Sequence, residues 1–205
     1  TCALLLKTDQ IKKIFQQSID VKQQCIDQGF NSLIKMGVQI IESIQHNNKL
    51  MFCGNGGSAA DAQHLAAEML VRLRPNNTRE GIPAIALAQD ISTITACGND
   101  FGYETLYERM VTSLGQEGDC LIGITTSGNS ENILRAMRAA KKMNIKVFGF
   151  LGSGGGRALE LCNEALVVPS DNTGRIQESH ITAGHALMEY IEDGLIESGH
   201  LHLQE

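Results

Sequence analysis

Two side chains on one helix-forming stretch could bind a metal or move a proton. His64 and Glu68 are four residues apart in an alanine-rich segment that starts near Ser58 and has strong helix propensity. Residues at this spacing lie on the same face of an α-helix. Their neighbours are mostly small or apolar, so we expect a largely packed helix in which a charge needs a partner or a metal. A solvated surface pair is the competing interpretation, and spacing alone does not exclude it.

The partners for this pair must come from elsewhere in the chain, because two ligands cannot close a metal site. Candidates gather near the start of a helix that we expect over residues 175–197: Gln177, Glu178, His180 and His185. No two of these candidates are four residues apart. Spacing therefore leaves the choice among them open.

A glycine-rich turn precedes the first of these helices. Leu50–Cys53 is an apolar run typical of a short buried strand, and Gly54, Gly56 and Gly57 then permit a sharp turn before Ser58. A strand, a glycine turn and a helix N-terminus favour anion binding, because free N–H groups and the helix dipole point at one place. The turn also matches a relaxed dinucleotide-binding pattern, which expects an acidic residue at the end of the next strand, about 20 residues later. The next predicted strand ends near Asp90, which is too far along the chain. We therefore rank a dinucleotide below other anions.

A second polar loop, Thr125–Ser130, lies between a predicted strand and a predicted helix, and its hydroxyl groups belong to Thr125, Thr126, Ser127 and Ser130. Ligands of open α/β sheets bind beyond the carboxyl ends of the strands, where this loop falls. Hydroxyls together with helix N-terminal amides suit a phosphate monoester. A plain helix cap would need a single hydroxyl. The loop therefore predicts a phosphate site.

Alternating strands and helices predict the fold that positions these residues. Short apolar runs indicate five strands, at residues 50–53, 83–87, 119–124, 145–150 and 165–169. The segments between them show mostly helical spacing, which implies βαβ crossovers and a doubly wound α/β domain with a parallel sheet.

The remaining boundaries complete this prediction. Residues 91–97 should form a short helix, and residues 98–102 a loop bounded by glycines. We treat residues 1–205 as one domain, with N-terminal helices in 1–47 for packing or oligomerisation and an α/β core in 48–197.

Composition narrows the class of protein. The 205 residues are 42% hydrophobic and 20% charged, as in an ordinary globular domain. The formal net charge of −6 gives no electrostatic reason to expect nucleic-acid binding. No apolar run reaches the roughly 18 residues of a membrane helix, and we find no signal-peptide pattern. The six cysteines are scattered without a Cys-x-x-Cys pair, which favours reduced thiols and the cytoplasm.

Four blocks taken together resemble the bacterial phosphoheptose isomerases, which are single-domain members of the sugar-isomerase (SIS) family. The blocks are Cys53–Ser58 with His64 and Glu68, Gly98–Gly102, Thr126–Ser130, and Arg175–Glu178 with His185. They follow the family's order and approximate spacing over nearly the whole chain. The resemblance implies a flavodoxin-like five-stranded parallel sheet flanked by helices. It also implies a homotetramer with sites near subunit interfaces.

The resemblance implies an activity as well. The family interconverts sedoheptulose 7-phosphate and D-glycero-D-manno-heptose 7-phosphate through an enediol(ate), the first step toward the heptose of lipopolysaccharide core. By this match, one zinc per subunit is held by His64, Glu68, Gln177 and His185, with Glu68 as the base and His185 as the acid. The implied substrate contacts are Asn55, Gly56, Gly57, Ser58, Glu68, Asn99, Asp100, Thr125, Thr126, Ser127, Ser130 and Gln177.

Two other classes of protein share these features in part. A non-catalytic SIS-domain protein that binds the replication initiator DnaA has the same fold and length. The presence of both Glu68 and His185 favours the enzyme. A sugar-phosphate-sensing regulator would carry a DNA-binding module, and the sequence shows no basic helix-turn-helix region.

Overall fold

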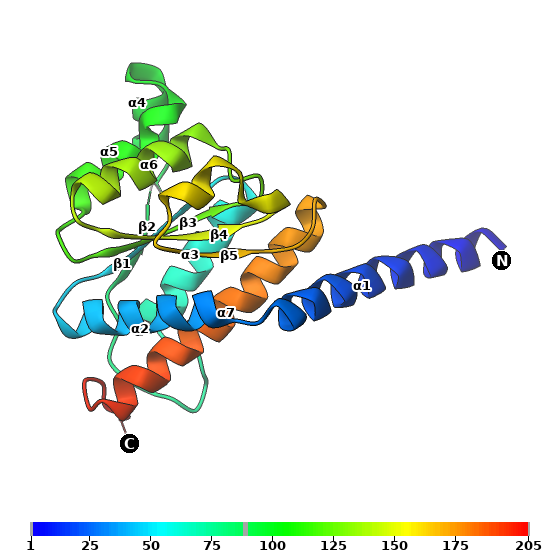
Figure 1. Cartoon of the computed structure of the whole chain (residues 1–205), viewed down its shortest axis with the longest axis horizontal. Helices are drawn as coiled ribbons and strands as arrows, with labels where there is room; N and C mark the ends of the chain where they lie inside the picture. Colours follow the sequence, from blue (N-terminus) through cyan, green and yellow to red (C-terminus); the bar gives the residue numbers. More distant parts are fainter. Residues whose placement is uncertain (1, 88–89, 205) are drawn as a thin grey trace.

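A five-stranded sheet forms the centre of the molecule in a computed structural model that describes residues 2–87 and 90–204 (Figure 1). The strands are β1 (Leu50–Gly54), β2 (Ala84–Ala86), β3 (Cys120–Thr125), β4 (Lys146–Leu151) and β5 (Glu164–Val167). All neighbouring strands are parallel, in the order β2-β1-β3-β4-β5. This confirms the predicted flavodoxin-like sheet. The strand order reverses between β1 and β3, which is where ligands bind in such folds.

Helices cover both faces of the sheet. The described residues form the helices α1 (Cys2–Gln28), α2 (Asn31–Gln45), α3 (Gly57–Leu70), α4 (Ile91–Asp100), α5 (Leu106–Leu114), α6 (Glu131–Lys142) and α7 (Thr173–Glu197), with 3-10 segments η1 (Tyr103–Thr105) and η2 (Ser153–Leu161). Figure 1 shows α2, α3 and α7 below the sheet and α5 and α6 above it. The apolar strands of the sequence are therefore those of a sheet buried on both faces.

The alternation of side chains along each strand divides the core into two layers. Leu50 and Phe52 of β1 pack with α2, α3 and α7, whereas Met51 and Cys53 pack with α5 and α6. Successive residues of a strand point to opposite faces, so a single apolar run supplies both layers. The layer below the sheet holds α3 and α7 against each other.

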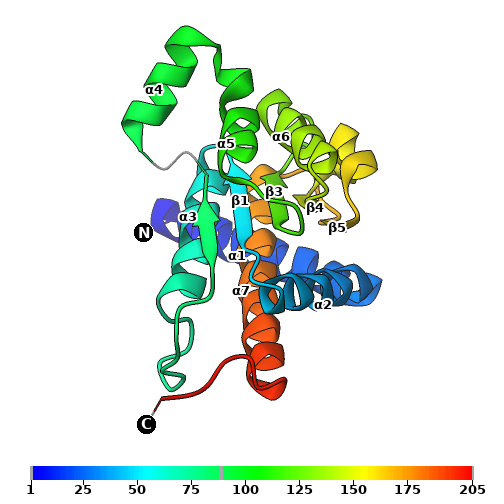
Figure 2. The same ribbon diagram turned by 90° about the vertical axis from the view of Figure 1, so that its left-hand side faces the viewer.

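Residues 98–100 differ from the prediction, because they form the last turn of α4 and not a loop. The Asp90 carboxylate caps the start of this helix by accepting a hydrogen bond from the Thr93 N–H at 2.7 Å. Gly98 lies in open space inside the helix, where a glycine costs only about 1 kcal/mol. The break comes instead at Gly102, whose φ of 88° is favourable for glycine. Figure 2 shows α4 projecting from the sheet beyond β2.

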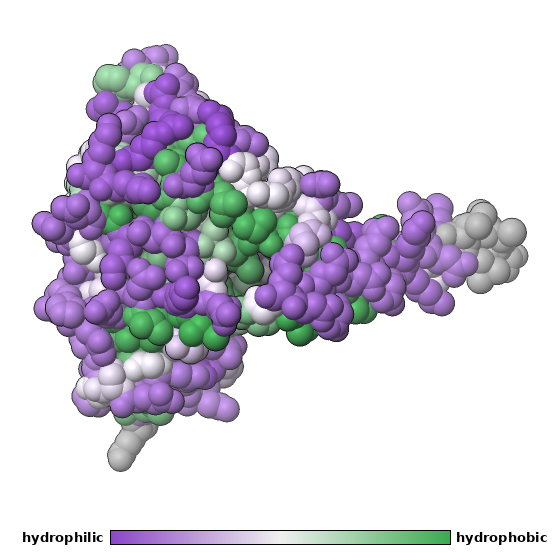
Figure 3. Space-filling model, viewed as in Figure 1, coloured by the Kyte–Doolittle hydropathy of each residue, from purple (hydrophilic) through white to green (hydrophobic). Residues whose placement is uncertain are grey.

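The N-terminal helix α1 extends away from the body as an arm (Figure 1). One stripe of this helix carries exposed apolar side chains, among them Ile11, Phe15, Ile19 and Ile26. Figure 3 shows apolar surface where the arm meets the body. A groove there is lined by Cys25, Ile26, Phe30, Leu33, Leu166 and Ala183, among others.

Two predictions from composition can be compared with the described residues. Cys25, Cys53, Cys97, Cys120 and Cys162 are free thiols, as predicted. The side chain of Cys2 lies outside the described residues. Within the described ranges, no helix is both long enough and apolar enough to cross a membrane.

Candidate active site

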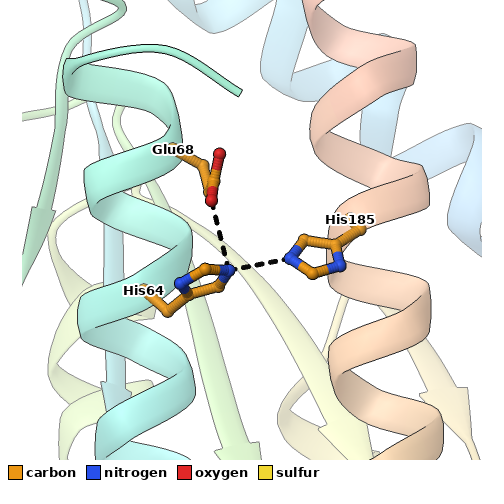
Figure 4. Close-up of side chains that lie close together, drawn as sticks. All are labelled: His64, Glu68 and His185. Atoms are coloured by element: carbon orange, nitrogen blue, oxygen red, sulfur yellow. Dashed lines mark hydrogen bonds and ion pairs between the residues drawn. The ribbon is translucent and has the colours of Figure 1, made fainter. Parts of the chain in front are cut away.

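His64, Glu68 and His185 meet between α3 and α7 (Figure 4). His64 Nε2 lies 2.8 Å from His185 Nε2 and 3.2 Å from Glu68 Oε1. The His64 side chain is 48% exposed and the Glu68 side chain 18%, so the cluster is open to a ligand. The pair predicted on α3 therefore has its partner on α7.

The close packing of α3 on α7 explains this meeting. A Cβ added to Gly184 would lie 2.8 Å from the Leu65 side chain, and one added to Gly57 would lie 2.8 Å from the Gln177 amide nitrogen. Residues 57 and 65 thus lie beside residues 177 and 184, so the two helices run side by side in the same direction. This register places His185 opposite His64.

His180, the other histidine on this part of α7, belongs to the packed interior and not to the cluster. It is buried, and its Nε2 lies 2.8 Å from the carbonyl oxygen of Leu151. Burial lowers the pKa of His180 to about 4, against the raising effect of this hydrogen bond, so the ring is neutral at pH 7. Of the histidines that the sequence left open, His185 is the one that joins the cluster.

The cluster has the donor set of a metal site. One nitrogen or oxygen atom from each of His64, Glu68 and His185 lies within 4.8 Å of the others. Tetrahedral zinc with these ligand types would hold its donor atoms about 3.3 Å apart. The observed spacings of 2.8 and 3.2 Å come close to this value, so small side-chain movements would admit a cation. The residues present therefore fit zinc.

A small polar cavity of about 90 Å³ lies beside the start of α3 and α6. Its lining residues are Asn55, Ser58, Ile124, Thr125, Thr126, Ser130 and Gln177. The glycine turn after β1 and the hydroxyl loop after β3 thus meet at the point where the strand order reverses. Five predicted substrate contacts from these two loops line one cavity, and Gln177 joins them from α7.

The hydroxyl loop is shaped to receive a ligand. Ser130 precedes α6, but its hydroxyl makes no cap hydrogen bond to the helix. It lies 3.3 Å from the Thr125 hydroxyl instead. The plain helix cap considered from the sequence is therefore not what the structure has at Ser130. Both hydroxyls remain near the N-terminus of α6, where the helix dipole favours an anion.

A glycine-rich segment supports this loop from behind. Gly128 has a φ of 66°, and its carbonyl oxygen accepts a hydrogen bond from the Ala158 N–H at 2.9 Å. A Cβ at Gly128 would lie only 1.9 Å from the Gly155 carbonyl oxygen, so no larger residue fits there. Ser127 is exposed at the tip, where its hydroxyl accepts a hydrogen bond from the Asn129 N–H.

The side chain of Asn55 makes hydrogen bonds within the protein. Its amide exchanges two hydrogen bonds with Asn132, at 2.9 and 2.8 Å, and its oxygen also accepts one from the Tyr103 hydroxyl. The sequence did not single out Asn132 or Tyr103 as support for the site. Asn132 lies two residues after Ser130, and this closeness to the hydroxyl loop is the one feature of the sequence that could have pointed to it. Asn55 thus braces the glycine turn against α6.

Besides Glu68 of the cluster, five predicted contacts lie outside the lining of this cavity: Gly56, Gly57, Ser127, Asn99 and Asp100. Gly56 is exposed at the glycine turn. Asn99 and Asp100 are exposed at the end of α4, where the Asn99 amide donates a hydrogen bond to Asp100 at 2.7 Å. They do not line the cavity, and their contact with substrate stays a prediction.

Comparison with known proteins identifies the class of protein that this fold and site define. The SIS domain family matches residues 14–152, so the chain carries a SIS domain. A phosphoheptose isomerase from a Nitratiruptor species is 54% identical over 153 residues, which cover 75% of this chain and 81% of that protein. The phosphoheptose isomerase of Aquifex aeolicus is 43% identical over 189 residues, 92% of this chain and 98% of the relative.

Solved structures agree with these relatives. A phosphoheptose isomerase from Francisella tularensis superposes with a TM-score of 0.86 at 35% identity, covering 91% of this chain and 98% of that chain. The enzyme from Neisseria gonorrhoeae gives a TM-score of 0.84 at the same identity and coverage. The chain therefore belongs to the phosphoheptose isomerase family. The comparisons do not support the alternative of a non-catalytic protein that binds DnaA.

Proposed function

We propose that the protein interconverts sedoheptulose 7-phosphate and D-glycero-D-manno-heptose 7-phosphate. The observation that carries this proposal is the meeting of Glu68 and His185 on α3 and α7, the two helices that also contribute Ser58 and Gln177 to the hydroxyl-lined cavity. A sugar phosphate needs both parts, one for the reacting carbons and one for the phosphate. The names of the relatives indicate a phosphorylated heptose, and the family resemblance supplies the particular pair of sugars.

We assign the two proton transfers of the reaction to Glu68 and His185. Aldose–ketose isomerisation moves a proton from C1 of the ketose to C2 through an enediol(ate), while the oxygen atoms exchange a second proton. We assign the first transfer to the Glu68 carboxylate, because a carboxylate accepts a proton and can return it to the neighbouring carbon. We assign the second to His185, because imidazole donates and accepts protons near neutral pH.

The four predicted ligands His64, Glu68, Gln177 and His185 would hold zinc at this place. When bound, the cation supplies positive charge that stabilises an enediolate and acidifies the neighbouring carbon. Gln177 lines the cavity, and its amide packs beside Gly57 at the start of α3, the helix that carries His64 and Glu68. Chelation of the metal should lower turnover reversibly if this proposal holds. An unchanged rate after verified metal loss would contradict it.

The phosphate would bind at Thr125, Thr126, Ser127 and Ser130. Their hydroxyls and the N-terminus of α6 suit an anion and leave the reacting end of the sugar near Glu68. Binding energy from a distant phosphate positions the carbons for reaction.

We also infer a homotetramer that uses α1. Ile11, Phe15 and Ile19 follow each other at four-residue spacing and are 57%, 69% and 58% exposed. An apolar stripe of this kind on a projecting arm favours contact with another chain. Light scattering of the purified protein should give the mass of four chains, and the mass of one chain would contradict the inference.

The experiment for the activity is a comparison of two substrates. Purified protein should convert sedoheptulose 7-phosphate to the aldose, detected by the anomeric proton of the product. Unphosphorylated sedoheptulose is the matched control and should react far more slowly, because it lacks the group that the hydroxyl loop binds. Equal rates on both sugars would contradict the assigned phosphate site. No conversion of either would contradict the proposed function.

A further inference from the structure

Asp61 is a half-buried carboxylate on α3 that the proposed reaction does not use. It lies three residues before His64 and seven before Glu68, so these side chains share one face of the helix. The same face carries Gly57, beside which the amide of Gln177 packs on α7. Asp61 thus occupies the middle of a polar stripe that joins the cavity to the cluster.

One oxygen of this carboxylate lacks a partner. Asp61 Oδ2 is inaccessible to solvent, and no hydrogen-bond donor reaches it among the described residues. A buried carboxylate oxygen without a donor is costly, and native structures rarely keep one without a reason. Since solvent does not reach this atom, a sugar hydroxyl does not reach it either. Its partner must be a donor on the protein.

The nearby imidazoles narrow the choice of donor. Burial raises the pKa of Asp61, while the charges of His64 and His185 act on it in the opposite direction. The Asp61 carboxylate is not part of the group of three donor atoms that lie within 4.8 Å of one another. It is therefore placed outside the metal ligands but within electrostatic reach of both imidazoles.

The imidazole of His64 has one ring nitrogen that does not face the cluster. Its Nε2 faces Glu68 and His185 (Figure 4), so Nδ1 is the ring nitrogen left for another partner. Metal-bound histidines commonly donate this second N–H to a carboxylate, which fixes the tautomer and the ring orientation.

We propose that Asp61 is a positioning residue, whose buried oxygen Oδ2 accepts the Nδ1–H of His64 when the Nε2 side of the cluster holds a divalent cation. This inference rests on the metal site of the proposed function. It explains why one carboxylate oxygen is buried here without a hydrogen-bond donor, because the ring orientation that the cation selects supplies that donor. Asp61 would act on the ligand, and would touch neither the metal nor the sugar.

The test measures zinc affinity and the stability of the metal-free protein in the same variants. Asp61→Ala should weaken zinc binding about 10- to 100-fold, as measured by competition with a fluorescent chelator, and Asp61→Asn should weaken it less. The thermal unfolding midpoint of metal-free Asp61→Asn should equal or exceed that of the wild type, because an unpaired buried charge has been removed. A residue with a merely structural role would lower the midpoint and leave the zinc affinity unchanged.

Asp119 provides the matched control. Its carboxylate is fully buried, but both oxygens have partners, because they accept hydrogen bonds from the Lys49 side chain and from the N–H groups of Lys49 and Gln116. Asp119→Asn should therefore lower the unfolding midpoint and leave zinc affinity unchanged. Zinc affinity of Asp61→Ala within twofold of the wild type would overturn the inference. Wild-type protein that binds no zinc would overturn it as well, whereas the isomerase proposal would fail only in its own substrate assay.

Discussion

Two polar clusters join the α3 region to α7. They differ in how many of their polar groups have hydrogen-bond partners within the protein. At the far end of α3, Arg79 and Glu192 form an ion pair at 2.6 Å with both side chains fully buried. At the site, His64 and Glu68 are partly exposed and His185 shares a nitrogen contact with His64. The first cluster is closed and the second is open.

Both carboxylate oxygens of Glu192 and all three nitrogens of the Arg79 guanidinium have hydrogen-bond partners in the closed cluster. Arg79 donates to the backbone carbonyls of Glu68 and Met69, which lie at the end of α3 and lack helical partners. The second carboxylate oxygen of Glu192 accepts hydrogen bonds from Arg74 and Asn77. The Arg79 contact to the Glu68 carbonyl links this framework directly to the site. A cluster whose polar groups are paired within the protein has a structural role. A cluster whose polar atoms can still bind a ligand is a candidate for function.

The largest expected effect is on catalysis at the open cluster. Glu68→Gln should lower kcat about 10²- to 10⁴-fold, because it removes the base while keeping the shape of the side chain. Its free energy of unfolding should stay close to that of the wild type, since Glu68 is not locked into a buried ion pair. Steady-state kinetics and urea unfolding of the same preparation provide the check. Wild-type turnover by this variant would remove Glu68 from its assigned role.

The closed cluster should show the reverse pattern. Arg79→Met should lower the free energy of unfolding by about 3 kcal/mol or more, because it leaves Glu192 without its buried partner. Zinc affinity of the folded variant should change far less than in Asp61→Ala. Arg138→Met is the control, because the Arg138–Glu131 pair is exposed and should contribute less than about 1 kcal/mol. Equal stability losses in the two variants would contradict the distinction between the clusters.

Acid should weaken the closed cluster in a predictable direction. Burial raises the pKa of Glu192, but hydrogen bonds from Arg79, Arg74 and Asn77 outweigh it and hold the pKa below its ordinary value of 4.5. A lowered pKa in the folded state contributes stability above about pH 4.5 that is lost as the pH falls through the folded value. Between about pH 6 and pH 3, the wild type should therefore lose more unfolding free energy than Glu192→Gln. Parallel stability curves would show that Glu192 does not carry this dependence.

The smallest expected effect is at the hydroxyl loop. Ser130→Ala removes one of four hydroxyls and should raise KM for sedoheptulose 7-phosphate about fivefold, consistent with roughly 1 kcal/mol for one hydrogen bond. Thr112→Ala is the control, because Thr112 is an exposed hydroxyl on α5 that bonds only within its own helix. If both variants kept the wild-type KM, Ser130 would not be a phosphate contact.

The sequence predicted the elements well because apolar periodicity is a local property. The five strands and the long helices follow from runs such as Leu50–Cys53, which fill both layers of the core. The prediction for the end of α4 is wrong because Gly98 and Asn99 are typical loop residues, although an exposed helical turn tolerates both. The position of the break depends on Gly102 and its positive φ.

The site was only half predictable from spacing. The pair His64 and Glu68 shares one helix face, and that follows from sequence alone. The choice of His185 over His180 depends on how α7 rotates against α3, which Gly184 and Leu65 set by close packing. Contacts of this kind join residues more than 100 positions apart, as in the 113-residue separation of Arg79 and Glu192. Family resemblance supplied His185 where spacing could not.

The central claim is that Glu68 removes a proton from C1 of a ketose phosphate. Proton NMR of sedoheptulose 7-phosphate in deuterated water measures this step directly, through loss of the C1 proton signals and growth of the aldose signals. Wild-type protein should produce both changes, and Glu68→Gln should produce neither over the same time. Unchanged substrate with the wild type, or equal rates with Glu68→Gln, would contradict the account.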